Sequence, residues 1–335
     1  MISPHRTLFP VAVTALLVAG TFYGAVDAQS KAPAKPSTEW PTYGHDPGGM
    51  RFSPLTELTP ANVAELKVAW TYHMRPAPPP GGAPAPPTPA GRGRGRGSGF
   101  AVSETTPLVI DGVMYITTPY GRVVALDSTT GKEIWVYQVP SGVPSTRGAE
   151  YWPGDAKTPA QIVFGTHDGR LISLHAKTGE PNDGFGDHGI INLNTPEILQ
   201  GLPGSDGMGS PPTMYKNLII TGGRTQENPP TGPAGDVRAW DVHTGKLVWT
   251  FHSIPRAGEK YNDTWAGDSW KNRSGVNVWG FITVDVQRGI VYMCCSVPGG
   301  ALNRAKLSTY CCISSRSACR MPNPKRPASS LRYQT

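Results

Sequence analysis

The clearest pattern along the chain is a series of short apolar runs separated by polar turns. Mostly apolar residues occupy positions 113–117 and 123–126, and a further run begins near 134–135. The pattern recurs at 161–165 and 171–174, then at 218–221, 237–240 and 247–251. Short runs bounded by glycine and polar residues are typical of β-strands. The pattern therefore predicts an all-β chain with successive groups of strands.

The links between these strands repeat as well. The segments ALDSTTGKEIW (125–135), SLHAKTGEPND (173–183) and AWDVHTGKLVW (239–249) each place Thr-Gly after a short polar link. Glycine there suits a turn that needs positive φ, and an aspartate such as Asp127 can accept hydrogen bonds from turn amides. Repeats of this size, built of four short strands, are typical of a β-propeller. A β-sandwich is the competing fold, but it does not explain a recurring D-x-x-T-G-x-x-x-W.

Charge and cysteine change the picture only at the C-terminal end. The formal net charge is +7, which alone would suggest a nucleic-acid partner. Residues 294–335 hold the excess, with seven Lys/Arg and no Asp or Glu, and the rest of the chain is balanced. All five cysteines lie in the same segment, so the body offers no disulfide framework. We therefore expect no nucleic-acid partner.

The N-terminal residues 1–28 have the pattern of a secretory signal peptide. A weakly charged start precedes an apolar run at 8–20, and VDA at 26–28 offers small residues at the −3 and −1 positions of a cleavage site. The apolar run is short for a transmembrane helix, and an uncleaved anchor is the alternative. A Pro/Lys linker follows at 29–38. We expect an exported, periplasmic protein that associates with the membrane surface.

Two further segments differ from the strand-rich body at 39–293. Residues 75–99 are low in complexity and predict a flexible surface insertion, with RNA or anionic-lipid binding by the Gly-Arg repeat as the alternative. After Met293 the composition switches abruptly to a basic, cysteine-bearing run without strand alternation. Residues 294–335 are therefore interpreted as an aberrant tail, frameshifted or disordered, and a genuine basic tail is the alternative.

The recurring turn resembles the tryptophan-docking motif of the quinoprotein alcohol and glucose dehydrogenases. The segments WPTYGHD (40–46), RFSPL (51–55) and LTPANV (58–63) resemble the opening of the glucose dehydrogenase branch. RGAEYWPGD (147–155) is similar to a segment beside the cofactor of methanol dehydrogenase. The resemblance implies an eight-bladed propeller, here the first three to four blades. It also implies pyrroloquinoline quinone and Ca²⁺ as cofactors, a small alcohol or sugar as substrate, and ubiquinone or cytochrome c as electron acceptor.

The resemblance also implies a set of site residues. Glu104 falls where the family places a glutamate near the quinone, Arg147 matches a cofactor-binding arginine, and Ser210 matches a hydroxyl donor. Trp279 matches the tryptophan that stacks under the quinone, and Glu227 aligns with a carboxylate that ligates Ca²⁺. These residue types suit the chemistry, because guanidinium binds carboxylates, indole is flat and Ca²⁺ prefers oxygen ligands. The structural alternatives are a core tryptophan, a surface ion pair for Arg147 and a solvated strand end for Glu104.

Two departures from the family bear on function. The adjacent cysteines of methanol dehydrogenase are missing from residues 139–146, which favours the sugar or general alcohol branches. The family's catalytic base belongs to a later blade, so we assign no catalytic residue and expect little or no activity from this chain alone. A non-catalytic propeller-type binding or scaffold fragment of the cell envelope is the alternative, as is a fragment that joins a separately encoded second half.

Overall fold

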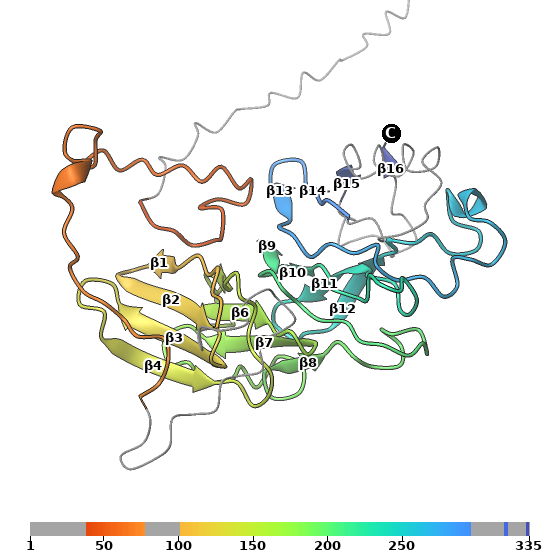
Figure 1. Ribbon diagram of the computed structural model, residues 1–335, viewed down its shortest axis with the longest axis horizontal. Helices are drawn as coiled ribbons and strands as arrows, with labels where there is room; N and C mark the ends of the chain where they lie inside the picture. Colours follow the sequence, from red (N-terminus) through yellow and green to blue (C-terminus); the bar gives the residue numbers. More distant parts are fainter. Residues whose placement is uncertain (1–37, 78–100, 296–317, 321–332, 335) are drawn as a thin grey trace, which may run out of the picture. The chain divides into compact units, whose positions relative to one another are not determined.

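The computed structural model describes residues 38–77, 101–295, 318–320 and 333–334 (Figure 1). These residues are almost entirely strand and loop, with two short 3-10 helices, η1 (Val63–Glu65) and η2 (Asn262–Thr264). The prediction of an all-β chain is therefore confirmed. Within the described ranges no helix is long and apolar enough to cross a membrane.

The strands form four antiparallel sheets of four strands each. The first sheet holds β1 (Leu108–Ile110), β2 (Val113–Thr118), β3 (Arg122–Asp127) and β4 (Glu133–Gln138). The second holds β5 (Glu150–Trp152), β6 (Gln161–Gly165), β7 (Arg170–His175) and β8 (Ile190–Asn192). The third holds β9 (Thr213–Tyr215), β10 (Leu218–Thr221), β11 (Val237–Asp241) and β12 (Leu247–Phe251). The fourth holds β13 (Thr283–Asp285), β14 (Ile290–Tyr292), β15 (Ala318–Arg320) and β16 (Tyr333–Gln334).

The longer strands follow the predicted apolar runs, whereas the short first strand of each sheet was not predicted. The longer strands appear as apolar runs because both of their faces are buried. β3 and β6 are buried at nearly every position, because the core lies between successive sheets. Between the first two sheets, Val123 packs in one buried cluster with Phe164. Leu171 and Ile219 belong to the cluster between the second and third sheets, and Val284 belongs to the cluster between the third and fourth. A strand covered on both sides reads as a continuous apolar run rather than an alternating one.

The repeated turns have the predicted geometry. The Asp127 Oδ1 atom accepts hydrogen bonds from the backbone amides of Thr129 (3.0 Å) and Thr130 (2.8 Å). Gly131 follows with φ +70° and donates its amide to the Asp127 carbonyl at 2.8 Å. Gly245 has the same φ, and its amide bonds to the Asp241 carbonyl at 2.8 Å. The need for positive φ explains why glycine recurs at this position.

A fourth copy of the turn, which the sequence pattern does not reveal, follows β13. Asp285 Oδ1 accepts hydrogen bonds from the amides of Gln287 (3.1 Å) and Arg288 (3.0 Å), and Gly289 has φ +65°. An arginine stands where the other turns with an aspartate have threonine, and this difference hid the repeat.

Tryptophan side chains connect consecutive sheets. The Trp135 indole of β4 lies against Gly179 in the second sheet, where an added Cβ would come within 2.5 Å of the ring. Its Nε1–H donates to the Ala176 carbonyl at 2.9 Å. Trp70, which precedes the first sheet, lies on Gly131 in the same way and donates to the Ser128 carbonyl at 3.2 Å. Glycine in these turns is therefore required by the indole as well as by φ.

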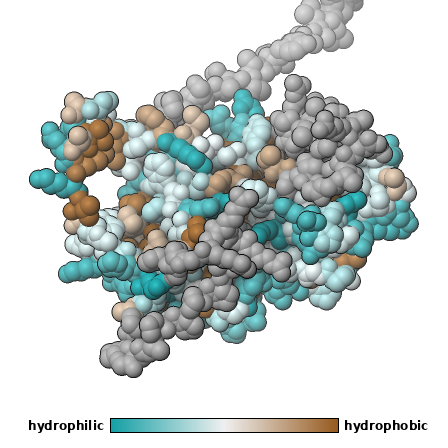
Figure 2. Space-filling model, viewed as in Figure 1, coloured by the Kyte–Doolittle hydropathy of each residue, from teal (hydrophilic) through white to brown (hydrophobic). Residues whose placement is uncertain are grey.

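The segment around η1 packs less closely than the sheets. Figure 2 shows apolar surface over this segment. Leu58, Leu66 and Val68 are exposed, the last at 83%. The segment therefore contributes little to the core, and its firm attachment begins at Trp70.

Parts of the predicted domain organisation lie outside the described residues. These parts are the signal peptide, most of the linker and most of the low-complexity insertion. Two short strands lie within the predicted tail and extend the fourth sheet, β15 pairing with β14 and β16 with β15. A sheet edge pairs through backbone groups, so side-chain alternation is not required for such a strand. The frameshift interpretation of 294–335 stays a prediction.

Candidate functional site

The predicted site residues occupy equivalent places in the repeat. Glu104, Arg147, Ser210 and Trp279 each precede the first strand of a different sheet, by three or four residues. Because the four sheets repeat one topology and pack in chain order, the segments before their first strands come together at one end. Residues far apart in the sequence thus meet in one cluster.

Arg147 lies at the centre of this cluster. Its Nε atom is 2.9 Å from Glu104 Oε2, and its Nη1–H donates to Ser210 Oγ at 3.3 Å and to the Trp279 carbonyl at 3.5 Å. The guanidinium carbon lies 5.3 Å from the centroid of the Trp279 ring. The Ser210 hydroxyl donates to the Trp279 carbonyl at 2.5 Å. The structure therefore brings four of the five predicted site residues into one connected group.

Exposure separates the roles of these four side chains. Trp279 is 43% exposed although its neighbour Val278 is buried, so the indole is not a core side chain. Ser210 is buried, and its hydrogen is directed at a backbone carbonyl rather than outward. Arg147 is partly exposed and keeps donors beyond those used by Glu104 and Ser210. An exposed flat ring beside a guanidinium can bind a planar anionic molecule.

Glu227 does not join this group. It is exposed in the loop between β10 and β11, and no hydrogen bond or ion pair connects it to the other four residues. Among the described residues, no three His, Cys, Asp or Glu side chains converge as metal ligands. One carboxylate does not make a Ca²⁺ site, which needs six to eight oxygens. Glu227 alone therefore does not account for a calcium site.

No site role is predicted from the sequence for His167 or Arg224, and both lie close to the cluster. The pKa of the His167 imidazole is held below its usual value, first by burial and then by the positive charges of Arg224 and Arg147. The imidazole Nε2 atom is buried and has no hydrogen-bond partner among the described residues. Two guanidinium groups from separate segments of the chain therefore lie close enough to His167 to lower its pKa.

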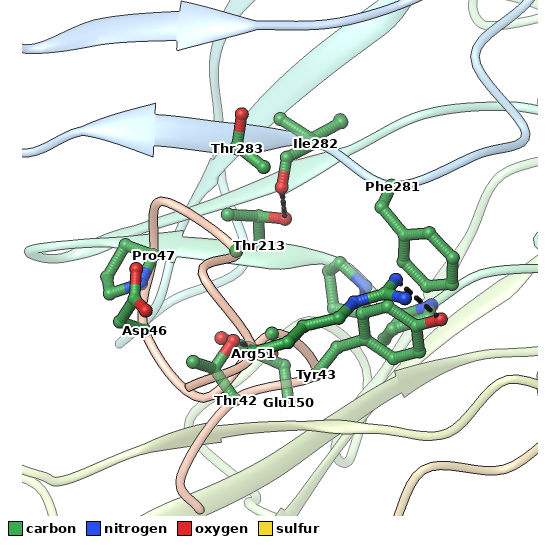
Figure 3. A pocket seen from close by; sticks show the side chains of 14 residues that line it. Thr42, Tyr43, Asp46, Pro47, Arg51, Glu150, Thr213, Phe281, Ile282 and Thr283 are labelled. Carbon is green, nitrogen blue, oxygen red and sulfur yellow. Dashed lines mark hydrogen bonds between the residues drawn. The ribbon is translucent and has the colours of Figure 1, made fainter. Parts of the chain in front are cut away.

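A small pocket lies beside the residues that follow three members of the cluster along the chain (Figure 3). It is lined by Glu150 and by segments at 211–213 and 281–283, which continue from Arg147, Ser210 and Trp279. The N-terminal segment 42–51 closes it, and Tyr43 stacks on Phe281 with ring centroids 3.5 Å apart. This segment therefore contacts the second sheet at Glu150 and the fourth sheet at Phe281 and Val284, close to the candidate site.

Glu150 is the buried carboxyl of this pocket. The Thr42 hydroxyl donates to Glu150 Oε2 at 2.9 Å, and the amides of Tyr43 and Met214 also bond to the carboxyl. Burial raises its pKa to about 8, although these hydrogen bonds oppose the change. Glu150 is therefore largely protonated at neutral pH and connects the N-terminal segment to β5 and β9.

Comparison with known proteins gives a consistent answer. Residues 40–306 match the family model of the PQQ-dependent glucose, ethanol and alcohol dehydrogenase β-propeller domain. The chain is 31% identical over 281 residues to the glycerol dehydrogenase large subunit of Gluconobacter oxydans, which covers 79% of this chain. It is 32% identical over 325 residues to the dehydrogenase subunit of the quinone alcohol dehydrogenase of Gluconacetobacter polyoxogenes, covering 87% of this chain.

A solved structure supports the fold. The quinohemoprotein alcohol dehydrogenase of Comamonas testosteroni superposes with a TM-score of 0.59 at 27% identity over 79% of this chain. The chain spans only about a third of the length of these proteins: 34%, 38% and 36%, respectively. The four sheets are therefore blades of a propeller, as predicted. The chain belongs to the family of PQQ-dependent quinoprotein alcohol and glucose dehydrogenases.

Proposed function

We propose that this chain forms part of the quinone-binding site of a periplasmic quinoprotein dehydrogenase that oxidises a small alcohol or sugar. The observation that supports this most is the meeting of Glu104, Arg147, Ser210 and Trp279 at one end of four blades. A shared surface ion pair would explain Glu104 and Arg147, but it would not explain a solvent-facing indole beside them.

The donor set fits pyrroloquinoline quinone, a planar molecule with three carboxylates. Arg147 would bind a carboxylate through the donors that Glu104 leaves free, and Glu104 would hold the guanidinium in place. Trp279 would supply a flat apolar floor. Ser210 would position Arg147 and the Trp279 segment, because its hydrogen already bonds to the Trp279 carbonyl. When bound, the quinone supplies the two-electron oxidation of the substrate hydroxyl.

The remaining partners are also proposals. Ca²⁺ would need ligands in addition to Glu227, so no step is assigned to it. Ubiquinone or cytochrome c is the proposed electron acceptor. The protein is proposed to associate with the membrane surface. No residue of this chain is assigned as the catalytic base, and low turnover by the chain alone stays a prediction.

The test is a titration of the purified chain with pyrroloquinoline quinone, followed by quenching of tryptophan fluorescence. We expect saturable binding that Arg147→Gln and Trp279→Ala each weaken about tenfold or more, because a charge-assisted hydrogen bond and an aromatic floor are lost. Arg288→Gln is the matched control, since Arg288 lies in an exposed turn and pairs with Asp285. Absence of binding, or equal losses in all three variants, would contradict the proposal. A dye-linked assay with glucose and ethanol measures turnover separately.

A further inference from the structure

A second arginine, Arg224, lies beside the candidate site just after β10. Its backbone amide donates to the Gly207 carbonyl at 2.8 Å and to Asp206 Oδ1 at 3.0 Å. The segment that begins with Asp206 and Gly207 continues to Ser210, which binds Arg147. The side chain of Arg224 is exposed. Its backbone is therefore fixed against the segment that supplies one member of the cluster.

Two glycines before Arg224 determine where a side chain can project. A Cβ on Gly223 would lie 2.6 Å from Asp206 Oδ1, and one on Gly222 would overlap with the Val278 carbonyl oxygen. Neither position tolerates a side chain, so Arg224 is the first residue after β10 that can project one. Because Val278 directly precedes Trp279, Arg224 emerges between the segment of Ser210 and the segment of Trp279.

Arg224 and Arg147 act on the same imidazole. Both positive charges lower the pKa of His167, in addition to its burial. Asp168 acts in the opposite direction, but its carboxylate is paired with Arg170 at 3.0 Å. The two guanidinium groups therefore approach the same part of the molecule, from separate segments of the chain.

The charge of Arg224 is not matched within the described part of the chain. No carboxylate there lies within ion-pair distance of its guanidinium, whereas Arg147 has Glu104 at 2.9 Å. Asp206, which bonds to the backbone of Arg224, is buried and has its own guanidinium partner in Arg238 at 3.2 Å. The Arg224 guanidinium is therefore available to an anionic ligand at this end of the blades.

We propose that Arg224 is a second carboxylate-binding residue of the quinone site and acts beside Arg147. This inference rests on the proposed function. A guanidinium binds one carboxylate bidentately, so two of them hold a planar molecule at two points and fix its orientation on the Trp279 ring. The pair selects quinones that carry more than one carboxylate over quinones that carry none.

The test compares quinone binding by the full chain and its variants. Pyrroloquinoline quinone is titrated into wild type, Arg224→Gln, Arg224→Lys and the control Arg288→Gln, at two salt concentrations. We expect Arg224→Gln to raise the Kd about tenfold or more and to reduce its salt dependence, because a charge-assisted contact is lost. Arg224→Lys keeps the charge but not the fork of donors, so we expect a smaller loss. Arg288→Gln should bind as wild type does.

A second ligand separates the carboxylate from the ring. Phenanthrenequinone is a planar ortho-quinone without carboxylates, and we expect wild type and Arg224→Gln to bind it equally. An equal loss for both quinones would overturn the role of Arg224 in carboxylate binding. Wild-type affinity in Arg224→Gln, with a loss in Arg147→Gln, would overturn it too and leave the proposed function standing.

Failure of wild type to bind pyrroloquinoline quinone would instead overturn the proposed function. Circular dichroism and the melting temperature show whether each variant is folded. If Arg224→Gln is unstable, Arg224→Lys decides, and unchanged affinity for pyrroloquinoline quinone in that variant overturns the inference.

Discussion

Burial and pairing decide which charged side chains are available to a ligand. Arg238 and Asp206 are both buried and hold each other at 3.2 Å, so they are structural. Arg147 and Arg224 lie nearer the solvent and keep free donors. Arginine occurs in both roles, so the residue type alone could not assign them. The family resemblance identifies Arg147 as a candidate ligand residue. Arg224 is identified only by the contacts of its own backbone and by the charged groups near it.

The first prediction concerns Asp206. Replacing it by asparagine leaves the buried Arg238 guanidinium without its closest carboxylate, and Asp236, 3.9 Å away, also serves Arg256 at 3.0 Å. We expect a loss of about 3 kcal/mol in the free energy of unfolding, in the range found when one partner of a buried pair is removed. Urea denaturation measures it. Asp183→Asn, at an exposed site, is the control, and a loss no larger than in this control would contradict the prediction.

The second prediction concerns the pH dependence of stability and Glu150. The folded-state pKa of about 8 lies above the ordinary value of 4.5, so the folded chain retains a proton that the unfolded chain releases between these values. The stabilisation by the protonated carboxyl is complete below about pH 4.5 and declines as the pH rises towards 8, with a limiting slope of about 1.4 kcal/mol per pH unit.

Glu150→Gln removes the titrating group and keeps a hydrogen-bonding side chain of similar size. We expect the free energy of unfolding of wild type to fall more steeply from pH 5 to pH 8 than that of the variant. Glu180→Gln, at an exposed turn position, should keep the wild-type slope. Parallel pH profiles for wild type and Glu150→Gln would show that the buried carboxyl does not control this dependence.

At the scale of elements, the turn and the tryptophan act together. The turn glycine must adopt positive φ, and its missing side chain also leaves room for an indole from the preceding part of the chain. The sequence predicted the first requirement, because Thr-Gly recurs in three copies. The resemblance to a tryptophan-docking motif implies a tryptophan at the turn, but it does not say which glycine each indole covers, because Trp135 and Gly179 belong to different sheets. The fourth turn at Asp285 shows that the geometry persists where the motif does not.

The third prediction compares two glycines that share a positive φ. Gly179 (φ +75°) lies under the Trp135 ring, whereas nothing is within 4 Å of a Cβ placed on Gly201 (φ +66°). Gly201→Ala should cost about 1 kcal/mol of backbone strain. Gly179→Ala should cost about 1–3 kcal/mol more, since the indole must move. Thermal or urea unfolding gives both values, and equal losses would mean that the tryptophan contact is not tight.

At the scale of the whole molecule, the larger core clusters lie between successive sheets. Each sheet shares a cluster of buried residues with the next, and a smaller cluster in the first sheet (Ile116, Val124, Leu126) is covered by Trp70 and Tyr72. Closely packed interiors transmit the loss of one side chain to both elements that contact it. We therefore expect the described blades to unfold cooperatively.

The fourth prediction tests this with Phe164, which is fully buried between the first two sheets. Phe164→Ala should lower the free energy of unfolding by about 3–5 kcal/mol, through lost burial and a cavity. It should shift a single urea transition without changing its slope. Val136→Ala, on the partly exposed β4, is the control and should change the free energy of unfolding little. A second urea transition, or a shift of only part of the unfolding curve, would show that the sheets unfold separately.

The sequence by itself determined the all-β fold class, the turns and the family, because these depend on local patterns within short stretches of the chain. It also placed Glu104, Arg147, Ser210 and Trp279, through motifs that resemble those of the family. Tertiary structure alone decided that these four residues meet, that Arg224 lies beside them and that the Glu150 carboxyl is buried under the N-terminal segment. The physical reason is that charge availability and pKa depend on neighbours brought together by the packing of sheets, and those neighbours are distant in sequence.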